Sequence, residues 1–335
     1  MSDTSSQLDA GIQVIEQLDL AQIPSGTINK FYLHLVTDGV GQPVYVPIMV
    51  AKGVRPGKVL GVTAAVHGNE LNGIPVIQRF FRQLNVADLE GIVVGVLIVN
   101  VPSLLRRTRR FIDGVDLNHI MPGRKDGAVS EIYAYRIVHR IIRQFDYLLD
   151  LHTASFGRVN SYYIRADLKD PVTRQMALLQ NAQIAVNNFP SDGTLRGAAE
   201  EMGIHAITLE VGNPNTFQKG MIRDGLTGIH NLLGYLGMLD CPIEEPAEPA
   251  IICRTSYWIY SDEGGILNVL PQVTQMVEKG ELIATIKNVF GDLIKEYFAP
   301  ETGVVIGKEV NPINQTGGRI LHLGIPEDLK AFQDH

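Results

Sequence analysis

VLGVTAAVHGNELNGIPVIQRFFRQL, residues 59–84, is the stretch that decides the fold class. Its first part, residues 59–66, is a short apolar run rich in valine, which is typical of a buried β-strand. Residues 70–84 repeat apolar side chains at helical spacing, so we expect an amphipathic helix there. The stretch therefore predicts a strand-to-helix unit with His67 at the turn.

The same alternation continues on the C-terminal side of this unit. Further strands are expected at residues 91–101, 146–153, 161–166 and 206–212, and helices at residues 130–145, 170–186 and 225–239. Continuous apolar strands that alternate with amphipathic helices indicate an α/β fold, with a mostly parallel mixed sheet flanked by helices on both faces. Ligands of such sheets bind beyond the carboxyl ends of the strands.

Two flanking segments have a different pattern. Residues 31–52 alternate apolar and polar side chains around a glycine-rich turn, which predicts an N-terminal β-hairpin. The prolines and acidic side chains of residues 240–254 indicate a linker, and the pattern after it predicts short strands separated by glycines. We expect a catalytic domain at residues 1–245 and a small all-β module at residues 250–335.

Composition excludes several classes of protein. The net charge is -7, and RRTRR at residues 106–110 is the one basic run, which argues against a nucleic-acid partner. Two cysteines, Cys241 and Cys253, are too few for a disulfide framework. The N-terminus lacks the pattern of a signal peptide, and no segment is apolar over the length of a membrane span. We expect a cytoplasmic protein that does not bind membranes.

Three residues at predicted strand ends form a candidate zinc site. His67 and Glu70 are three residues apart in the first turn, and His152 ends the strand at residues 146–153. In a first helical turn this spacing points two side chains to one side. Two imidazoles and one carboxylate that leave a fourth position open are the ligands of a catalytic zinc ion. The alternative is a turn histidine beside a Glu that interacts with the helix dipole.

Two further carboxylates lie near these ligands. Asp150 is two residues before His152 on the same strand face, where it either holds the free ring nitrogen of a metal-bound histidine or pairs with a turn. Glu210 ends the apolar strand at residues 206–212. A carboxylate at the tip of a buried strand is costly without a function or a cation, so Glu210 is either catalytic or part of a structural salt bridge.

Four motifs in order carry a resemblance to a known family. HGNE at residues 67–70, DLN at 116–118, DLH at 150–152 and LEVG at 209–212 together resemble the succinylglutamate desuccinylase/aspartoacylase family, a branch of the zinc carboxypeptidase-like hydrolases. The resemblance covers roughly residues 45–240. It implies one Zn²⁺ per chain bound by His67, Glu70 and His152, with Glu210 as the general acid/base.

The resemblance also implies substrate contacts. Arg110 matches the arginine that polarises the scissile carbonyl, although Arg109 stays open because this loop is one residue longer than in some relatives. Asn118 matches a residue that holds the substrate. His119 stands where the family usually has an arginine that grips a carboxylate, and histidine cannot reproduce that charged fork. Arg196 either supplies an anion site instead or is an ordinary surface arginine.

These patterns predict a zinc-dependent amide hydrolase that deacylates a small N-acyl amino acid or a related amide. A metallocarboxypeptidase acting on peptide C-termini is the alternative within enzymes. The histidine at position 119, in place of the arginine that binds a C-terminal carboxylate, counts against it. A non-catalytic zinc-binding protein of the same fold is the alternative outside enzymes. The partner expected is a small-molecule substrate, and the sequence leaves a homo-oligomer open.

Overall fold

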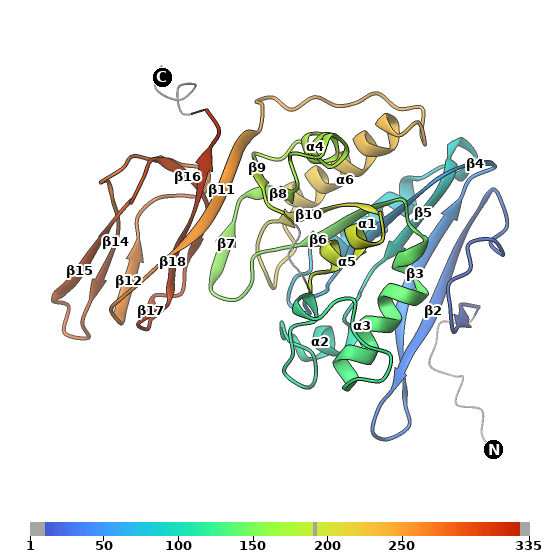
Figure 1. Ribbon diagram of the computed structural model, residues 1–335, viewed down its shortest axis with the longest axis horizontal. Helices are drawn as coiled ribbons and strands as arrows, with labels where there is room; N and C mark the ends of the chain where they lie inside the picture. Colours follow the sequence, from blue (N-terminus) through green and yellow to red (C-terminus); the bar gives the residue numbers. More distant parts are fainter. Residues whose placement is uncertain (1–10, 190–192, 329–335) are drawn as a thin grey trace.

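The computed structural model describes residues 11–189 and 193–328. In that part of the chain, a fourteen-stranded mixed sheet crosses the whole molecule and a four-stranded sheet lies at one end (Figure 1). The spatial order of the large sheet is β1 (Gln13–Ile15), β2 (Thr27–Thr37), β3 (Pro43–Lys52), β5 (Glu90–Val96), β4 (Arg55–Ala64), β6 (Tyr147–His152), β10 (His205–Val211), β8 (Tyr162–Ala166), β9 (Ile184–Asn187), β11 (Ile251–Tyr260), β18 (Arg319–Pro326), β16 (Gly303–Glu309) and β13 (Met276–Val277), and β7 (Arg158–Asn160) pairs with β16. The smaller sheet contains β15 (Leu293–Phe298), β14 (Leu282–Lys287), β12 (Gly265–Val269) and β17 (Ile313–Asn314).

Helices cover both faces of the large sheet. One face packs against α1 (Gly73–Gln83), α4 (Pro171–Leu178) and α6 (Lys219–Tyr235), and the other against α3 (Val129–Arg140) and α5 (Leu195–Glu201). The short elements are α2 (Val101–Arg106) and the 3₁₀ turns η1 (Val86–Asp88), η2 (Leu117–His119) and η3 (Ile142–Gln144). Each face has its own apolar core, so the expected mixed sheet flanked by helices is confirmed.

The middle of the sheet positions the candidate site. Strands β5, β4, β6 and β10 are parallel neighbours, so their carboxyl ends meet at one edge. In the register of β6 and β10, His152 lies directly beside Glu210. Residues that are far apart in the sequence therefore share this edge of the sheet.

The four predicted helices begin or end elsewhere: the helix expected at residues 130–145 ends at Arg140, and the helix expected at residues 225–239 spans Lys219–Tyr235. The first helix begins at Gly73 rather than at residue 70, because residues 65–72 form a loop in which the Asn72 side chain donates to the Val211 carbonyl oxygen at 2.7 Å. The helix expected at residues 170–186 ends at Leu178. Asn181 has a left-handed backbone with φ of 52°, which interrupts the helix, and the remaining residues form β9.

The C-terminal segment continues the large sheet. Strand β11 pairs in parallel with β9, and β18, β16 and β13 follow outwards, while the four-stranded sheet packs over them around a third apolar core. The hairpin expected at residues 31–52 lies at residues 27–52 as β2 and β3. The domain bounds 1–245 and 250–335 include residues outside the described part and stay predictions.

None of the helices in residues 11–189 and 193–328 has the length and apolar character that crossing a membrane requires. The cytoplasmic location stays a prediction.

Candidate metal centre and cavity

Two neighbouring strand ends place the candidate ligands together. His67 lies three residues beyond β4, Glu70 lies in the loop before α1, and His152 is the last residue of β6. All three are buried, with exposed fractions of 2%, 2% and 4%. Because the helix begins at Gly73, a tight turn brings His67 and Glu70 together, with the amide of Glu70 donating to the His67 carbonyl oxygen at 3.1 Å. The spacing argument from a helical turn is therefore wrong, although the two side chains do meet.

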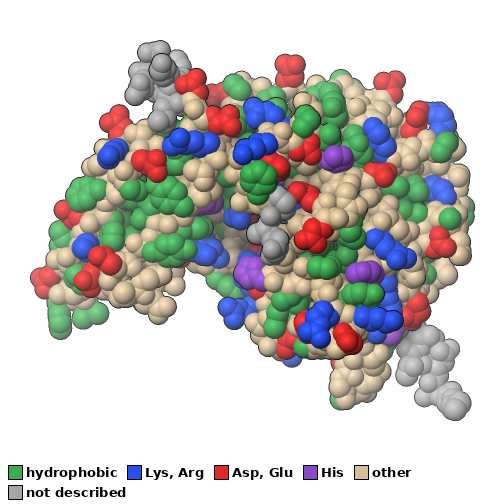
Figure 2. All heavy atoms as spheres, viewed as in Figure 1, with side chains coloured by type: hydrophobic (Ala, Val, Ile, Leu, Met, Phe, Trp, Pro, Cys, Tyr) green, Lys and Arg blue, Asp and Glu red, His purple; other side chains and the backbone are tan. Residues whose placement is uncertain are grey.

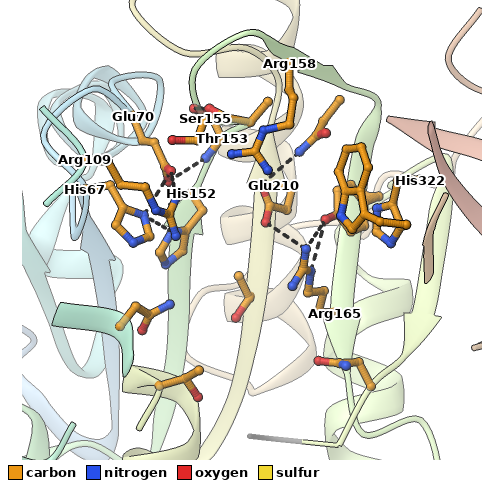
Figure 3. A pocket seen from close by; sticks show the side chains of 18 of the residues that line it. His67, Glu70, Arg109, His152, Thr153, Ser155, Arg158, Arg165, Glu210 and His322 are labelled. Carbon is orange, nitrogen blue, oxygen red and sulfur yellow. Dashed lines mark hydrogen bonds and ion pairs between the residues drawn. The ribbon is translucent and has the colours of Figure 1, made fainter. Parts of the chain in front are cut away.

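The three side chains converge on one point (Figure 3). The Nδ1 atoms of His67 and His152 are 3.2 Å apart. The Glu70 carboxylate spans them, with Oε1 at 2.9 Å from His67 Nδ1 and Oε2 at 2.9 Å from His152 Nδ1. Two imidazole nitrogens that share a tetrahedral zinc ion at its usual bond lengths are about 3.3 Å apart. The spacing of the nitrogens fits that ion.

A carboxylate holds the outer nitrogen of each imidazole. His67 Nε2 lies 3.0 Å from Asp116 Oδ1, and His152 Nε2 lies 2.8 Å from Asp150 Oδ2. Thr63 in turn donates to Asp150 Oδ1. We infer that both Nε2 atoms carry protons, which directs both Nδ1 lone pairs to the same point. Two lone pairs at that spacing need a cation or a proton between them, so the donor set fits a divalent metal ion.

The charges agree with this assignment. Burial raises the pKa of Glu70, but His67 and His152 outweigh burial and hold that pKa well below its usual range. Burial lowers the pKa of His152, but Asp150 and Glu70 outweigh it and raise that pKa well above its usual value. Asp116 also has a pKa well below its usual range, because contacts with His67 outweigh its burial. The centre therefore holds ionised carboxylates that favour a positive charge between the rings.

Glu210 lies on the strand next to His152. Its carboxylate accepts a hydrogen bond from Asn160 Nδ2 at 3.2 Å, and Arg165 Nη2 lies 3.7 Å from its Oε1 atom. Tyr163, which faces Glu210 in the register of β8 and β10, accepts hydrogen bonds from Arg165. Glu210 is thus held beside the metal centre, in contact with an amide and a guanidinium group.

The two candidate arginines are placed differently. Arg109 donates to Glu70 Oε1 and to Asp116 Oδ2, both at 2.9 Å. Arg110 is exposed, and its guanidinium lies 3.4 Å from the Gly114 carbonyl oxygen. Both side chains line the cavity, but only Arg109 contacts the metal centre.

The other predicted substrate residues also line this cavity. Asn118 Oδ1 accepts from the Leu195 amide at 2.8 Å, so it anchors the loop to α5. Arg196 is buried rather than on the surface, and it donates to the backbone and side chain of Asn188. Burial lowers the pKa of Arg196 to about 10, which keeps it charged near neutrality. His119 lies at the same wall as Asn118.

A polar cavity of about 620 Å³ opens from the metal centre towards the C-terminal strands. Figure 2 shows the hollow between the β-rich end and the rest of the molecule, with basic and histidine side chains at its rim. Sequence reasoning missed much of its lining: Asp116, Arg158, Asn160, Tyr163, Arg165, Trp258, Arg319 and His322. Asp116 stands in the DLN motif and could have been found from it. The other seven carry no local signal, because non-local strand pairing brings them to the cavity.

Comparison with known proteins identifies the family. Residues 56–236 match the family described as the succinylglutamate desuccinylase/aspartoacylase catalytic domain. The chain belongs to this family. The match contains the candidate ligands and Glu210, and in the structure the succinylglutamate desuccinylase/aspartoacylase domain supplies the central parallel strands.

Curated relatives of the family include two deacylases. The chain is 26% identical over 280 residues to the N-alpha-acetyl-L-2,4-diaminobutyric acid deacetylase of Halomonas elongata, which covers 79% of this chain and 81% of the relative. It is 28% identical over 180 residues to the succinylglutamate desuccinylase of Pseudomonas paraeruginosa, which covers 49% of this chain and 54% of the relative. The chain thus spans about half the length of that second relative.

Solved structures of the family share the fold. A succinylglutamate desuccinylase/aspartoacylase from Rhodobacter sphaeroides superposes with a TM-score of 0.82 at 22% identity, covering 92% of this chain and 98% of that chain. The product-bound ectoine utilization protein EutE from Ruegeria pomeroyi gives a TM-score of 0.82 at 21% identity, covering 91% and 98%. Both overlaps extend beyond residues 56–236 into the C-terminal strands.

Proposed function

We propose that this chain is a zinc-dependent deacylase, which hydrolyses the amide bond of a small N-acyl amino acid to a carboxylic acid and a free amine. The observation that carries the proposal is the convergence of two imidazole nitrogens and one carboxylate beside Glu210 in a polar cavity. The relatives that act on acetylated diaminobutyric acid and on succinylglutamate support the same bond type.

The residues that would hold the ion are His67, Glu70 and His152. A zinc ion bound by two imidazoles and one carboxylate lowers the pKa of its water ligand to about 7 and polarises a carbonyl group. Asp116 and Asp150 fix the orientation of the two rings.

Glu210 is our candidate for the proton-transfer group. It accepts a proton from the attacking water on a carboxylate oxygen and delivers that proton to the departing amine nitrogen. Asn160 and Arg165 contact its two oxygens from the side of β7 and β8, so the carboxylate is held in one orientation. Glu210 and His152 are direct neighbours across β10 and β6, which places the proton acceptor beside the ligand set.

Arg109 is our candidate for stabilising the negative charge that develops on the carbonyl oxygen. The sequence favoured Arg110, but Arg109 is the arginine in contact with Glu70 and Asp116. Asn118 and His119 lie on the adjoining wall and are proposed to contact the substrate. Arg196, charged and buried in the same cavity, is proposed to attract an anionic group.

The test combines metal analysis with a substrate panel. Purified protein is assayed for zinc and for release of amine from N-acetyl and N-succinyl amino acids, with short peptides as the comparison. Glu210→Gln should keep its zinc and lose about 100-fold or more of its turnover. His67→Ala should lose both zinc and activity.

Three results would contradict the proposal. Full activity of Glu210→Gln would remove that residue from its role. Cleavage of peptides but not of N-acyl amino acids would identify a carboxypeptidase. Stoichiometric zinc without hydrolysis of any amide would identify a non-catalytic protein.

A further inference from the structure

Within the described residues, two guanidinium groups in the cavity wall form no ion pair, although the Glu309 carboxylate is near both and Glu309 faces Arg158 in the strand register. Arg158 is the first residue of β7, and Arg319 is the first residue of β18. Across residues 11–189 and 193–328, neither guanidinium forms an ion pair or a hydrogen bond. Burial and the nearby charges of Arg319 and Arg109 lower the pKa of Arg158, and they outweigh the attraction of Glu210 and Glu309. Like charges held together beside a cavity favour an anion between them.

A neutral aromatic pair holds these arginines in place. Trp258 on β11 faces His322 on β18 in the strand register, and their rings stack at 5.0 Å with an interplanar angle of 12°. The guanidinium carbons of Arg319 and Arg158 are 5.0 and 5.7 Å from the centroid of the Trp258 ring. Burial and the surrounding arginines, Arg165 among them, hold the pKa of His322 well below its usual value, so the pair adds no charge. Stacking on an aromatic ring orients a guanidinium group without neutralising it.

Other guanidinium groups of the cavity wall are already engaged. Arg109 binds Glu70 and Asp116, and Arg165 binds Tyr163 and lies beside Glu210. Six arginines line the cavity against three carboxylates, so positive charge is in excess. Arg158 and Arg319 are the members of this set whose guanidinium groups contact only an aromatic ring within the described residues.

Arg158 lies close to Glu210, and His322, which stacks on Trp258, lies on the side of Glu210 away from the metal centre (Figure 3). Figure 3 shows His67 and His152 on one side of Glu210, with Arg165 and His322 on the other. Asn160, which donates to Glu210, is two residues after Arg158 on the same strand. In the proposed reaction Glu210 protonates the amine, so the amine half of the substrate extends towards this side.

We propose that Arg158, Arg319 and Trp258 form a subsite for a carboxylate of the amine half of the substrate. The subsite rests on the proposed function, since deacylation of an N-acyl amino acid leaves the carboxylate on that half. A guanidinium fork pairs with a carboxylate through two parallel hydrogen bonds, and the anion relieves the repulsion between Arg158 and Arg319. The C-terminal strands β11 and β18 thereby take part in substrate selection.

A binding experiment tests the subsite without turnover. Trp258 is the only tryptophan of the chain, so its fluorescence reports on this wall alone. Succinate should change the emission in a saturable way, and uncharged succinamide should not. Arg319→Gln should weaken succinate binding by about tenfold or more. Arg254→Gln, an exposed arginine on the same strand as Trp258, is the matched control and should bind as the parent does.

Some binding results would overturn the subsite. An equal response to succinamide would show that the site does not distinguish a carboxylate from an uncharged amide. Unchanged binding by Arg319→Gln would show that Arg319 does not bind a carboxylate, and it would reject the subsite. Inorganic phosphate that binds as tightly as succinate would show an unselective anion site.

Kinetics separates this subsite from the proposed function. For an N-acyl amino acid that the parent cleaves, Arg319→Gln should lower kcat/KM by about tenfold through KM, and it should leave the uncharged carboxamide of that substrate unaffected. An equal loss on both substrates would reject the subsite in a protein that is still a deacylase. If no N-acyl amino acid is cleaved, the proposed function fails, while succinate binding that depends on Arg319 would still support the carboxylate site.

Discussion

The Nε2 atom of His67 lies 3.0 Å from Oδ1 of Asp116, and this contact fixes the direction of the opposite ring nitrogen. His152 has the equivalent contact with Asp150 at 2.8 Å. The metal centre is thus built from two histidine–carboxylate pairs that meet at the Glu70 carboxylate. Such outer carboxylates set the tautomer and increase the basicity of the ligand.

Asp116→Asn should weaken zinc binding by about 10- to 100-fold, because the amide keeps the shape of the side chain but loses the charge that polarises His67. Competition with a chromophoric chelator measures the affinity. Asp113→Asn is the matched control, since Asp113 is an exposed acid of the same loop that caps the Val115 amide. Equal zinc affinity in both variants would show that Asp116 does not support the ligand.

Zinc binding should release a proton near neutral pH. Asp150 and Glu70 raise the pKa of His152 well above its usual value although burial lowers it, so the metal-free ring is protonated. A metal ligand must be deprotonated, and the affinity should therefore fall as the pH is lowered. Titration calorimetry in buffers of different ionisation enthalpy should give about one proton released per zinc ion. An affinity that is constant from about pH 8 to about pH 6 would contradict this linkage.

The strand ends explain why the ligands could be predicted from sequence. His67, His152 and Glu210 each follow an apolar run that local pattern identifies as a strand, and parallel strands bring such ends to one edge. The turn that joins His67 to Glu70 could not be predicted in the same way. It depends on Asn72, whose side chain bonds with residues of a strand and loop some 140 positions away, at sequence separations of 139 and 146.

The residues of the cavity wall could not be predicted from the sequence for a related reason. Trp258 and Arg319 reach the site only because β11 pairs with β9 and β18 pairs with β11. Neither pairing leaves a periodic signal in the chain, since each depends on which edge of the sheet is free. The sequence therefore predicted the C-terminal strands but not that β11, β18, β16 and β13 continue the large sheet.

Gly68 should not tolerate a side chain. A Cβ atom at this position would overlap the backbone carbonyl of Ser103 at the start of α2. Gly68→Ala should lower the free energy of unfolding by about 1–3 kcal/mol and displace the neighbouring His67, so that zinc is lost as well. Urea unfolding and metal analysis measure the two effects. Gly220→Ala is the control, because a Cβ there meets nothing within 4 Å, and it should keep full zinc content.

Ionisation of Glu200 should make the folded protein less stable at about pH 7 and above than at about pH 5. Burial, with Asp167 and Asp170 nearby, outweighs the attraction of Arg196 and raises the pKa of Glu200 to about 7. Because this pKa lies above the unfolded value, the folded state binds the extra proton, and stability falls as the pH rises from about 4.5 to about 7. Glu200→Gln removes this loss. Relative to the parent, its free energy of unfolding should be about 1 kcal/mol more favourable at about pH 8 than at about pH 5, after allowance for solvent screening. Urea unfolding at the two pH values measures it. The exposed neighbour Glu201→Gln should keep the pH dependence of the parent, and a similar gain in both variants would assign the effect to net charge rather than to the half-buried Glu200 carboxylate.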